Sequence, residues 1–321
     1  MSFSIFLELL PATLADGLVL GLLYATIALG YTMVYGVLGL INFAHSEIFM
    51  VGAIVAVEVL TYLLVGSNLH PLAQLAFAMV LAASVSAALA GLAERVAYRP
   101  LRRSNAPKLA PLITAIGISL FLQDTVRFVE SLFGQFIRPF PSMPFFDNAF
   151  HVSDTFSVPV KSLVILAVAA AMLGGLIYIV NRTRLGKAIR AVATDRTAAS
   201  LMGINVNRIV LGTFLIGGAL AGVAGTLYAL QFGRVDPFTG FIPGLKAFTA
   251  AVLGGIGSIP GAMVGGIVLG LLEMLLGTFL PLLTDNAIGT EYKDIFAFGI
   301  LILILIVKPT GLMGRASTEK V

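Results

Sequence analysis

Residues 17–53 read GLVLGLLYATIALGYTMVYGVLGLINFAHSEIFMVGA, an apolar run with one short polar group near its end. The part from 17 to 46 contains no Asp, Glu, Lys or Arg. A helix needs about 20 mostly apolar residues to cross a bilayer, so this run is long enough for a membrane-spanning helix followed by a turn. Asn42, His45 and Glu47 lie where that turn is expected. The polar group is therefore either an ordinary bend in water or a polar feature at or inside a membrane.

The composition of the whole chain is that of a membrane protein. Of its 321 residues, 58% are hydrophobic and 11% are charged, and the mean hydropathy is +1.00. A soluble domain has roughly 25% charged residues. A soluble protein of this size cannot bury so much apolar surface, because much of any folded surface faces water. We therefore predict an all-α polytopic integral membrane protein, with residues 1–321 forming a single transmembrane domain.

Further apolar runs divide the rest of the chain into spans. Runs without charged residues lie at 59–93, 109–123, 162–180, 209–233, 247–272 and 295–307. The first of these is split by the turn GSNLHP, and the fifth is broken by GGIGSIPGA. We predict about eight transmembrane helices, with broken or re-entrant segments near 39–48 and 254–262. Both segments combine Gly or polar residues with flanking apolar runs, which is typical of interrupted membrane helices.

Basic residues predict the orientation of the chain. The segment 94–108 contains five Lys or Arg and the segment 181–208 contains six, whereas 131–161 is rich in aromatic residues and Pro and contains two. Cytoplasmic loops carry an excess of Lys and Arg. We therefore predict cytoplasmic loops at 94–108 and at about 182–208, an outer loop at about 132–160 and a cytoplasmic C-terminus. Because the basic residues indicate topology, no nucleic-acid partner is expected.

The predicted cytoplasmic loop has the pattern of two short helices. The stretch from 187 to 202 is rich in Ala, Arg and Leu and lacks Pro, which favours helix. Asp195 can cap the second helix, and Gly203 can end it. Ala198, Leu201 and Met202 belong to a small apolar patch on this loop. Such a projecting helix is either a docking element for a partner protein or a solvated helix at the membrane surface.

Motifs of common enzymes are absent from the sequence. There is no G-x-x-x-x-G-K-[ST] phosphate loop, no H-E-x-x-H and no G-x-S-x-G. The three histidines are scattered and there is no cysteine, so neither a metal site nor thiol catalysis is expected. We predict that the chain is not an enzyme and holds no cofactor of its own.

Two acids lie inside predicted spans, where an ionisable side chain is costly and is a candidate for function. Glu58 lies in the second span and Glu273 in a later one. For each, an interhelical hydrogen bond or a subunit contact is one interpretation, and contact with a substrate is the other.

A charged group lies at the outer end of the predicted span at 109–130. It consists of Asp124, Arg127 and Glu130. Arg127 is three residues from each acid, so it can pair with either along the helix. We expect this group to be a structural ion pair or an anchor at the membrane interface.

Glycines recur at a spacing of four inside the predicted spans. Examples are Gly218-x3-Gly222 and Gly266-x3-Gly270. Small residues at this spacing let helix backbones approach closely in lipid. The pattern indicates close helix packing or an element that slides during transport.

The loop and two apolar segments resemble a known family. In chain order, the matching loop residues are Gly186, Arg190, Ala191, Asp195, Ala198, Gly203 and Ile204. They resemble the coupling loop of ABC-importer permeases. The opening stretch and FTAAVLGGIGSIPGAMVGGIVLGLLE at 248–273 are similar to LivH-type permeases for branched-chain amino acids. The resemblance extends from about Gly17 to Met313.

This resemblance implies a membrane-spanning permease subunit of an importer in a bacterial inner membrane. It implies a partnership with a second, homologous permease as a heterodimer, and with two cytoplasmic ATPases that carry ATP and Mg²⁺. A periplasmic or lipid-anchored binding protein would deliver leucine, isoleucine or valine. An ATP-independent carrier or channel, and a permease of the same family for urea or short-chain amides, remain alternatives.

The two predicted helix breaks are the candidates for the transport pathway, because broken helices expose backbone groups and polar side chains. The residues expected to line a pathway or gate are Asn42, His45, Glu47, Gly254, Gly255, Gly257, Ser258 and Pro260. A buried His45 or Glu47 that faces a cavity would support a pathway. A tight turn in which Asn42 satisfies backbone groups is the alternative.

Overall fold

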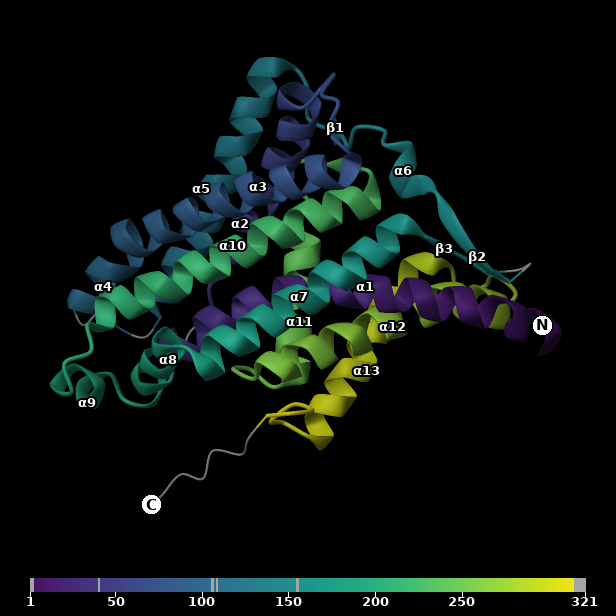
Figure 1. Cartoon of the computed structure of the whole chain (residues 1–321). Coiled ribbons are helices and arrows are strands. Elements are labelled where there is room, and N and C mark those ends of the chain that lie inside the picture. Colours follow the sequence, from purple (N-terminus) through teal and green to yellow (C-terminus); the bar gives the residue numbers. More distant parts are fainter. Residues whose placement is uncertain (1–2, 40, 105–106, 108, 154–155, 315–321) are drawn as a thin grey trace.

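The computed structural model describes residues 3–39, 41–104, 107, 109–153 and 156–314, which form a bundle of long helices (Figure 1). In this part of the chain, seven helical stretches are long and apolar enough to cross a membrane: Phe6–Leu38, Ala44–Leu63, Pro71–Arg103, Ala110–Phe133, Val160–Arg182, Val206–Phe232 and Ile259–Leu283. Helices α11 (Phe241–Gly254) and α13 (Lys293–Val307) are shorter. The predicted all-α polytopic fold is confirmed, and the seven candidate spans in the described residues are one fewer than the predicted number of about eight.

The helices of these spans and the other elements of the described chain have the following bounds. The helices are α1 (Phe3–Leu38), α2 (Ala44–Glu58), the π-helix η1 (Val59–Leu63), α3 (Pro71–Ala93), the π-helix η2 (Glu94–Tyr98), α4 (Arg99–Arg103), α5 (Ala110–Phe133), α6 (Pro144–Asp147), α7 (Val160–Arg182), α8 (Arg184–Thr194), α9 (Arg196–Leu201), α10 (Val206–Phe232), α12 (Ile259–Leu283) and the 3₁₀-helix η3 (Thr290–Tyr292). Two antiparallel ribbons pair β1 (Arg138–Pro139) with β4 (Arg234–Val235), and β2 (Ala149–Ser153) with β3 (Phe156–Pro159).

Helix α1 lies at the centre of the bundle, and α5 lies at its edge. In the most apolar stretch of α1, 94% of the residues are buried, compared with 6% for α5. Helix α1 packs mainly along α12 and α10, and it also contacts α11 and α7. The end of α1 and the break that follows it are therefore held inside the molecule.

Glycines make the closest helix contacts. Gly222 of α10 lies against the backbone of Ala82 in α3, and Gly266 of α12 lies against Ala25 of α1. A Cβ atom at either glycine would overlap the neighbouring backbone. The close packing predicted from the glycine spacing is therefore present at two of the main helix interfaces.

Both predicted helix breaks are real helix ends. Helix α1 ends at Leu38 and α2 begins at Ala44, with Gly39 in the left-handed region at φ +67°. Helix α11 ends at Gly254 and α12 begins at Ile259, with Gly255 at φ +105°. Such backbone angles favour glycine because it has no Cβ.

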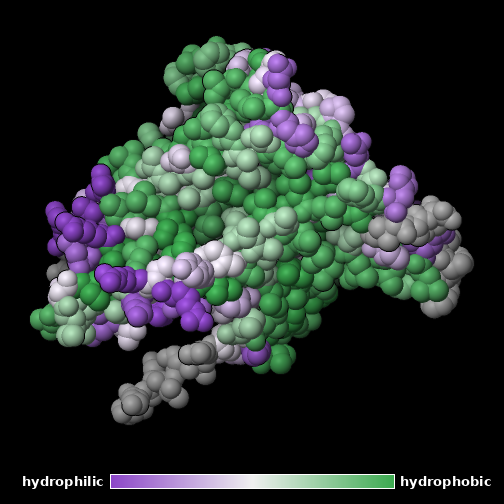
Figure 2. Space-filling view, in the orientation of Figure 1, coloured by the Kyte–Doolittle hydropathy of each residue, from purple (hydrophilic) through white to green (hydrophobic). Residues whose placement is uncertain are grey.

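The basic segment that starts at residue 94 is more helical than the sequence indicates. A loop is predicted at 94–108, but the helix continues from α3 through η2 and α4 to Arg103. Residues 105, 106 and 108 lie outside the described part. Figure 2 shows hydrophilic side chains gathered at the end of the molecule formed by α4 and α8, and again near β1 and α6, with a mostly hydrophobic surface between them. This banded surface fits a protein that crosses a membrane.

Candidate functional site

The polar group between α1 and α2 is buried. The side-chain oxygen of Asn42 accepts a hydrogen bond from the Tyr98 hydroxyl at 2.7 Å and another from the Ala44 backbone N–H at 3.2 Å. Asn42 therefore joins the start of α2 to η2. The ring of His45 packs edge-on against Tyr31 of α1, with 4.7 Å between the ring centroids, and leaves no room for a Cβ atom at Gly30. His45 thus fills the contact between α1 and α2.

Glu47, in the first turn of α2, faces a cavity. Its side chain is 1% exposed and borders a space of about 440 Å³. One carboxylate oxygen, Oε1, accepts long hydrogen bonds from the hydroxyls of Ser119 at 3.4 Å and Ser46 at 3.5 Å. The other, Oε2, has no hydrogen-bond partner within the described residues. The burial and the cavity are the observations that favour a pathway over a solvent turn.

Three elements supply the walls of this cavity, which we call the Glu47 cavity. They are the region of the α1–α2 break, the middle of α5 and the start of α11. The lining residues are Tyr31, Phe43, Ser46, Glu47, Ile116, Ser119, Leu120, Gln123, Phe238, Phe241, Ile242 and Leu245. Most of these side chains are apolar, and several of them are exposed, including Phe241 at 59% and Ile242 at 52%. The carboxylate is therefore a polar group at the bottom of an open-sided apolar cleft.

A series of cavities follows one side of α1 towards the basic end of the molecule. Tyr31 borders both the Glu47 cavity and a small cavity that Ile41 and Ile256 also line. Tyr35, about one helical turn further on, borders both the small cavity and a wide one of about 1010 Å³. The two broken segments, although far apart in sequence, therefore meet at the same series of cavities.

The residues of the second break, between α11 and α12, lie in two different environments. Gly257, Ser258 and Pro260 line the wide cavity, and their role in a pathway or gate stays a prediction. Gly254 and Gly255 instead pack against backbone: Gly254 lies against the first turn of α12, and Gly255 against the segment after α13. The backbone N–H of Leu312 donates to the Leu253 carbonyl at 2.7 Å, and that of Met313 to the Gly254 carbonyl at 2.9 Å.

The loop between α7 and α10 has the predicted capped helices. The Asp195 carboxylate accepts hydrogen bonds from the backbone N–H groups of Thr197 at 2.7 Å and Ala198 at 3.0 Å, which caps α9. Gly203, at φ +81°, follows the end of this helix. The predicted cap and stop are therefore confirmed. Leu201 and Met202 at the tip of α9 are 84% and 82% exposed.

The other loop residues named from the sequence hold α8 against α7. Gly186 lies so close to the carbonyls at the end of α7 that a Cβ atom would not fit. The Arg190 guanidinium donates a hydrogen bond to the Val180 carbonyl of α7. Ala191 is half-buried and Ala198 is exposed. The apolar surface that α9 offers is thus mainly its tip.

One basic residue of this loop connects it to the first helix break. Nη2 of Arg196 donates hydrogen bonds to the carbonyls of Val37 at 2.9 Å and Leu38 at 2.8 Å, the last two residues of α1. Burial and the positive charge of Arg102 lower the pKa of Arg196. The sequence offered no signal for this contact, because Arg196 is only one of six basic residues in the segment.

Comparison with known proteins identifies the family. The pattern of the family described as "Branched-chain amino acid transport system / permease component" matches residues 13–305. The chain belongs to this family. It is 45% identical to the high-affinity branched-chain amino acid transport system permease protein BraD of Pseudomonas aeruginosa, over 96% of this chain and 97% of the relative. It is 44% identical to the corresponding protein LivH of Escherichia coli, over 95% of this chain and 96% of the relative. A probable branched-chain amino acid transport permease protein LivH of Methanocaldococcus jannaschii is 29% identical, over 91% and 89%.

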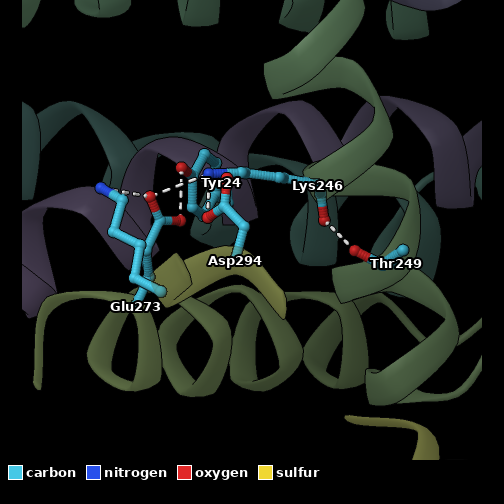
Figure 3. A network of polar contacts seen from close by, with 6 residues as sticks. Tyr24, Lys246, Thr249, Glu273 and Asp294 are labelled. Atoms are coloured by element: carbon cyan, nitrogen blue, oxygen red, sulfur yellow. Dashed lines mark hydrogen bonds and ion pairs between the residues drawn. The ribbon is translucent and has the colours of Figure 1, made fainter. Parts of the chain in front are cut away.

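Glu273 of the permease belongs to a buried ionic network (Figure 3). Its carboxylate is 2.8 Å from Nζ of Lys246 and 3.0 Å from Nζ of Lys293, and it accepts a hydrogen bond from the Tyr24 hydroxyl at 2.9 Å. Lys246 also pairs with Asp294 at 2.8 Å. Two positive and two negative side chains thus connect α11, α12 and α13, and the Tyr24 hydroxyl connects this network to α1. The geometry is that of an interhelical contact, and Lys246 is a partner that sequence analysis did not identify.

A second ionic cluster centres on Arg138 in β1. Its Nε is 2.7 Å from Glu130 of α5 and 3.1 Å from Glu58 of α2. Although burial opposes protonation, the hydrogen bond to Glu130 and the charges of Glu58 and Glu130 raise the pKa of Arg138. Glu130 thus forms a structural ion pair, but with Arg138 and not with Arg127, the partner that helical spacing allowed. Arg127 lies over the ring of Phe238 at 5.8 Å, and Asp124 is exposed. The reason is that Glu130 turns towards the buried guanidinium of Arg138.

Proposed function

We propose that this chain is a membrane-spanning permease subunit of an ATP-binding cassette importer that translocates leucine, isoleucine and valine. Near full-length similarity to permeases named for branched-chain amino acid transport supports the substrate class. The observation that carries the proposal is the series of cavities along α1, which begins beside Glu47 and ends against the loop at α8 and α9. In this proposal the cavities are parts of one transport path, and these parts open one after another and not at the same time.

The proposed complex has further subunits. Two cytoplasmic ATPases hold ATP and Mg²⁺, because the sequence of the permease contains no phosphate loop. They dock on the tip of α9, where Leu201 and Met202 extend into solvent. A second, homologous permease completes the membrane unit, and a periplasmic or lipid-anchored binding protein delivers the amino acid. The complex resides in a bacterial inner membrane.

The proposed mechanism links ATP binding to the helix breaks. Closure of the ATPase pair moves α8 and α9, and Arg196 passes this movement to the end of α1. The α1–α2 break then shifts against the α11–α12 break and changes the side from which the cavities are accessible. ATP binding can favour one arrangement of the helices by no more than the difference in its binding free energy between the two arrangements. A flexible connection would lose part of this free energy, so the proposed mechanism requires a rigid link.

Reconstitution tests this function. The permease is placed in liposomes with its second permease and ATPases, and leucine-loaded binding protein is added inside or outside as the orientation requires. We expect leucine uptake that needs ATP and is reduced by excess isoleucine or valine but not by urea. Uptake without ATP would indicate a carrier or channel, and competition by urea alone would indicate a different substrate.

A surface substitution tests the docking of the ATPases. Leu201→Asp removes an exposed apolar side chain and adds a charge at the tip of α9. We expect the variant to be inserted normally but to lose most of its ATPase subunits during purification, because buried apolar anchors supply much of the binding energy of interfaces. Ser200→Asp is the matched control, since it adds the same charge to an exposed position of α9 without removing apolar surface. Equal loss of ATPase from both variants would contradict apolar docking.

A further inference from the structure

We infer that the Glu47 cavity is a transient binding subsite in which the Glu47 carboxylate accepts the α-ammonium group of an aliphatic amino acid and the aromatic wall contacts its hydrocarbon side chain. The inference rests on the proposed function, since it assigns a chemical role to one part of the proposed path. It is carried by the charge balance of the buried acids and by the chemistry of the cavity walls.

Glu47 differs from the other buried acids. Within the described residues, the acidic side chains classed as buried are Glu47, Glu94, Glu130 and Glu273. Glu94 pairs with two arginines, Glu130 with one, and Glu273 with two lysines. No Lys or Arg in the described part of the chain forms an ion pair with Glu47. A buried carboxylate without a cation is costly. The cavity beside it is where a cationic partner can enter.

The oxygen of Glu47 that has no hydrogen-bond partner in the described residues is buried next to a glycine. Gly240, just before α11, lies so close to Oε2 that a Cβ atom there would press against the carboxylate. Oε1 accepts only two long hydrogen bonds, from Ser46 and Ser119, and Oε2 is buried without a hydrogen-bond partner in the described residues. In the proposed bound state, a small shift of the carboxylate towards the cavity brings one of these oxygens to the ammonium group. An ammonium group has three donors and suits such a site as a hydrogen-bond donor and as a charge.

The other walls suit the rest of an aliphatic amino acid. Phe43, Phe241, Ile242 and Leu245 form an apolar surface that favours a hydrocarbon side chain. The amide of Gln123 also lines the cavity and can donate to the substrate carboxylate. The volume of about 440 Å³ lies within the range of small-molecule sites.

The cavity contains few polar groups, as suits a site that a transported substrate occupies only briefly. A transport site must bind its substrate well enough for entry and weakly enough for release. One carboxylate with few further hydrogen-bonding groups recognises the positive charge of the substrate but binds it with low affinity. Tight selection can then reside in the separate binding protein.

Protection of an introduced thiol measures this binding directly. Because the natural sequence contains no cysteine, Leu245→Cys gives the permease a single thiol in the cavity wall. We expect leucine to slow its modification by a thiol reagent in the assembled complex. The 2-oxo acid analogue of leucine, which lacks the ammonium group, should give no protection. Phe121→Cys is the control, because that side chain is 69% exposed on α5 and does not line the cavity.

Neutralising the carboxylate tests its role. We expect Glu47→Gln to abolish the protection by leucine and to lower ATP-driven leucine uptake by about tenfold or more, since a tenfold change corresponds to the loss of about one charged contact. Glu47→Asp should retain part of both activities. Asp124→Asn is the control for charge removal, because Asp124 is exposed on α5, the helix that supplies one wall of the cavity, and does not itself line the cavity.

The outcomes separate this inference from the proposed function. If the unmodified complex transports leucine but Glu47→Gln is unchanged in uptake and protection, the inference is wrong and the proposed function stands. If Glu47→Gln loses its second permease during purification, the missing cation is a side chain of that subunit, and the inference is overturned. If the unmodified complex moves no amino acid, the proposed function itself fails.

Discussion

Replacement of Arg196 should disconnect the α8–α9 loop from the helix break. Arg196→Met keeps the length of the side chain but removes the hydrogen bonds to the Val37 and Leu38 carbonyls, at 2.9 and 2.8 Å. These carbonyls lie at the C-terminal end of α1, where backbone acceptors have no partner within the helix. A positive charge there also interacts favourably with the helix dipole.

The size of the effect follows from these two contacts. A hydrogen bond from a charged donor contributes about 1.5–3 kcal/mol, and the lower value applies to Arg196 because its side chain is partly exposed to water. Two such bonds give a link of about 3 kcal/mol at most. Since about 1.4 kcal/mol corresponds to a tenfold change in an equilibrium, the movement of α9 should be transmitted about ten- to a hundredfold less effectively.

The assay compares ATP hydrolysis with transport in the reconstituted complex. We expect Arg196→Met to keep its ATPase subunits and its basal hydrolysis, while leucine uptake per ATP hydrolysed falls by about tenfold. Arg103→Met is the control, because Arg103 is an exposed arginine on α4 at the same end of the molecule. An unchanged ratio of uptake to hydrolysis in Arg196→Met would refute the link, and partial rescue by Arg196→Lys would support it.

Three substitutions test the structural contacts. Glu273→Gln should lower the free energy of unfolding by about 3–5 kcal/mol, because it removes one partner from a buried ionic network, and this is measured as earlier thermal unfolding in detergent. Arg138→Met should have a similar effect, because it leaves the acid of Glu130 buried and unpaired, and the same thermal assay measures it. Gly222→Val should lower the yield of folded protein on size-exclusion chromatography, because its side chain would overlap the backbone of α3. Gly117→Val on α5, where a Cβ atom meets nothing within 4 Å, should leave that yield unchanged.

Features with a local cause could be predicted from the sequence. The spans follow from the length of the apolar runs, and both helix breaks follow from glycine and polar residues between them. The cap of α9 depends only on Asp195 and the next three residues, so it too is visible in the sequence. The continuation of the helix to Arg103 was missed, because a cluster of arginines resembles a solvated loop and does not itself end a helix.

Pairings between distant residues could not be predicted. Glu273 finds its partners 27 and 249 positions away, at Lys246 and Tyr24. Helical spacing favoured Arg127 as the partner of Glu130, but a guanidinium from the following ribbon lies closer. Likewise, Arg196 contacts α1 across 158 positions. Periodicity reports which face of a helix is apolar, but it does not report which other helix lies against that face.

The distribution of charge in the fold separates the regions that ion pairs hold from the helix break that moves in the proposed mechanism. Glu94, Glu130 and Glu273 are neutralised by bases of this same chain, and these pairs connect η2 to α4, α5 to β1, and α12 to α11. Glu47, in contrast, lies immediately after a helix break and has no basic partner in the described residues. An internal cation at that position would lower the energy of one arrangement of the break and so oppose its movement. A cation that arrives with the substrate gives the same stabilisation only while the substrate is present. The unpaired acid at the break and Arg196 at the end of the preceding helix would then act on one element from opposite ends, Glu47 in response to the substrate and Arg196 in response to the ATPases.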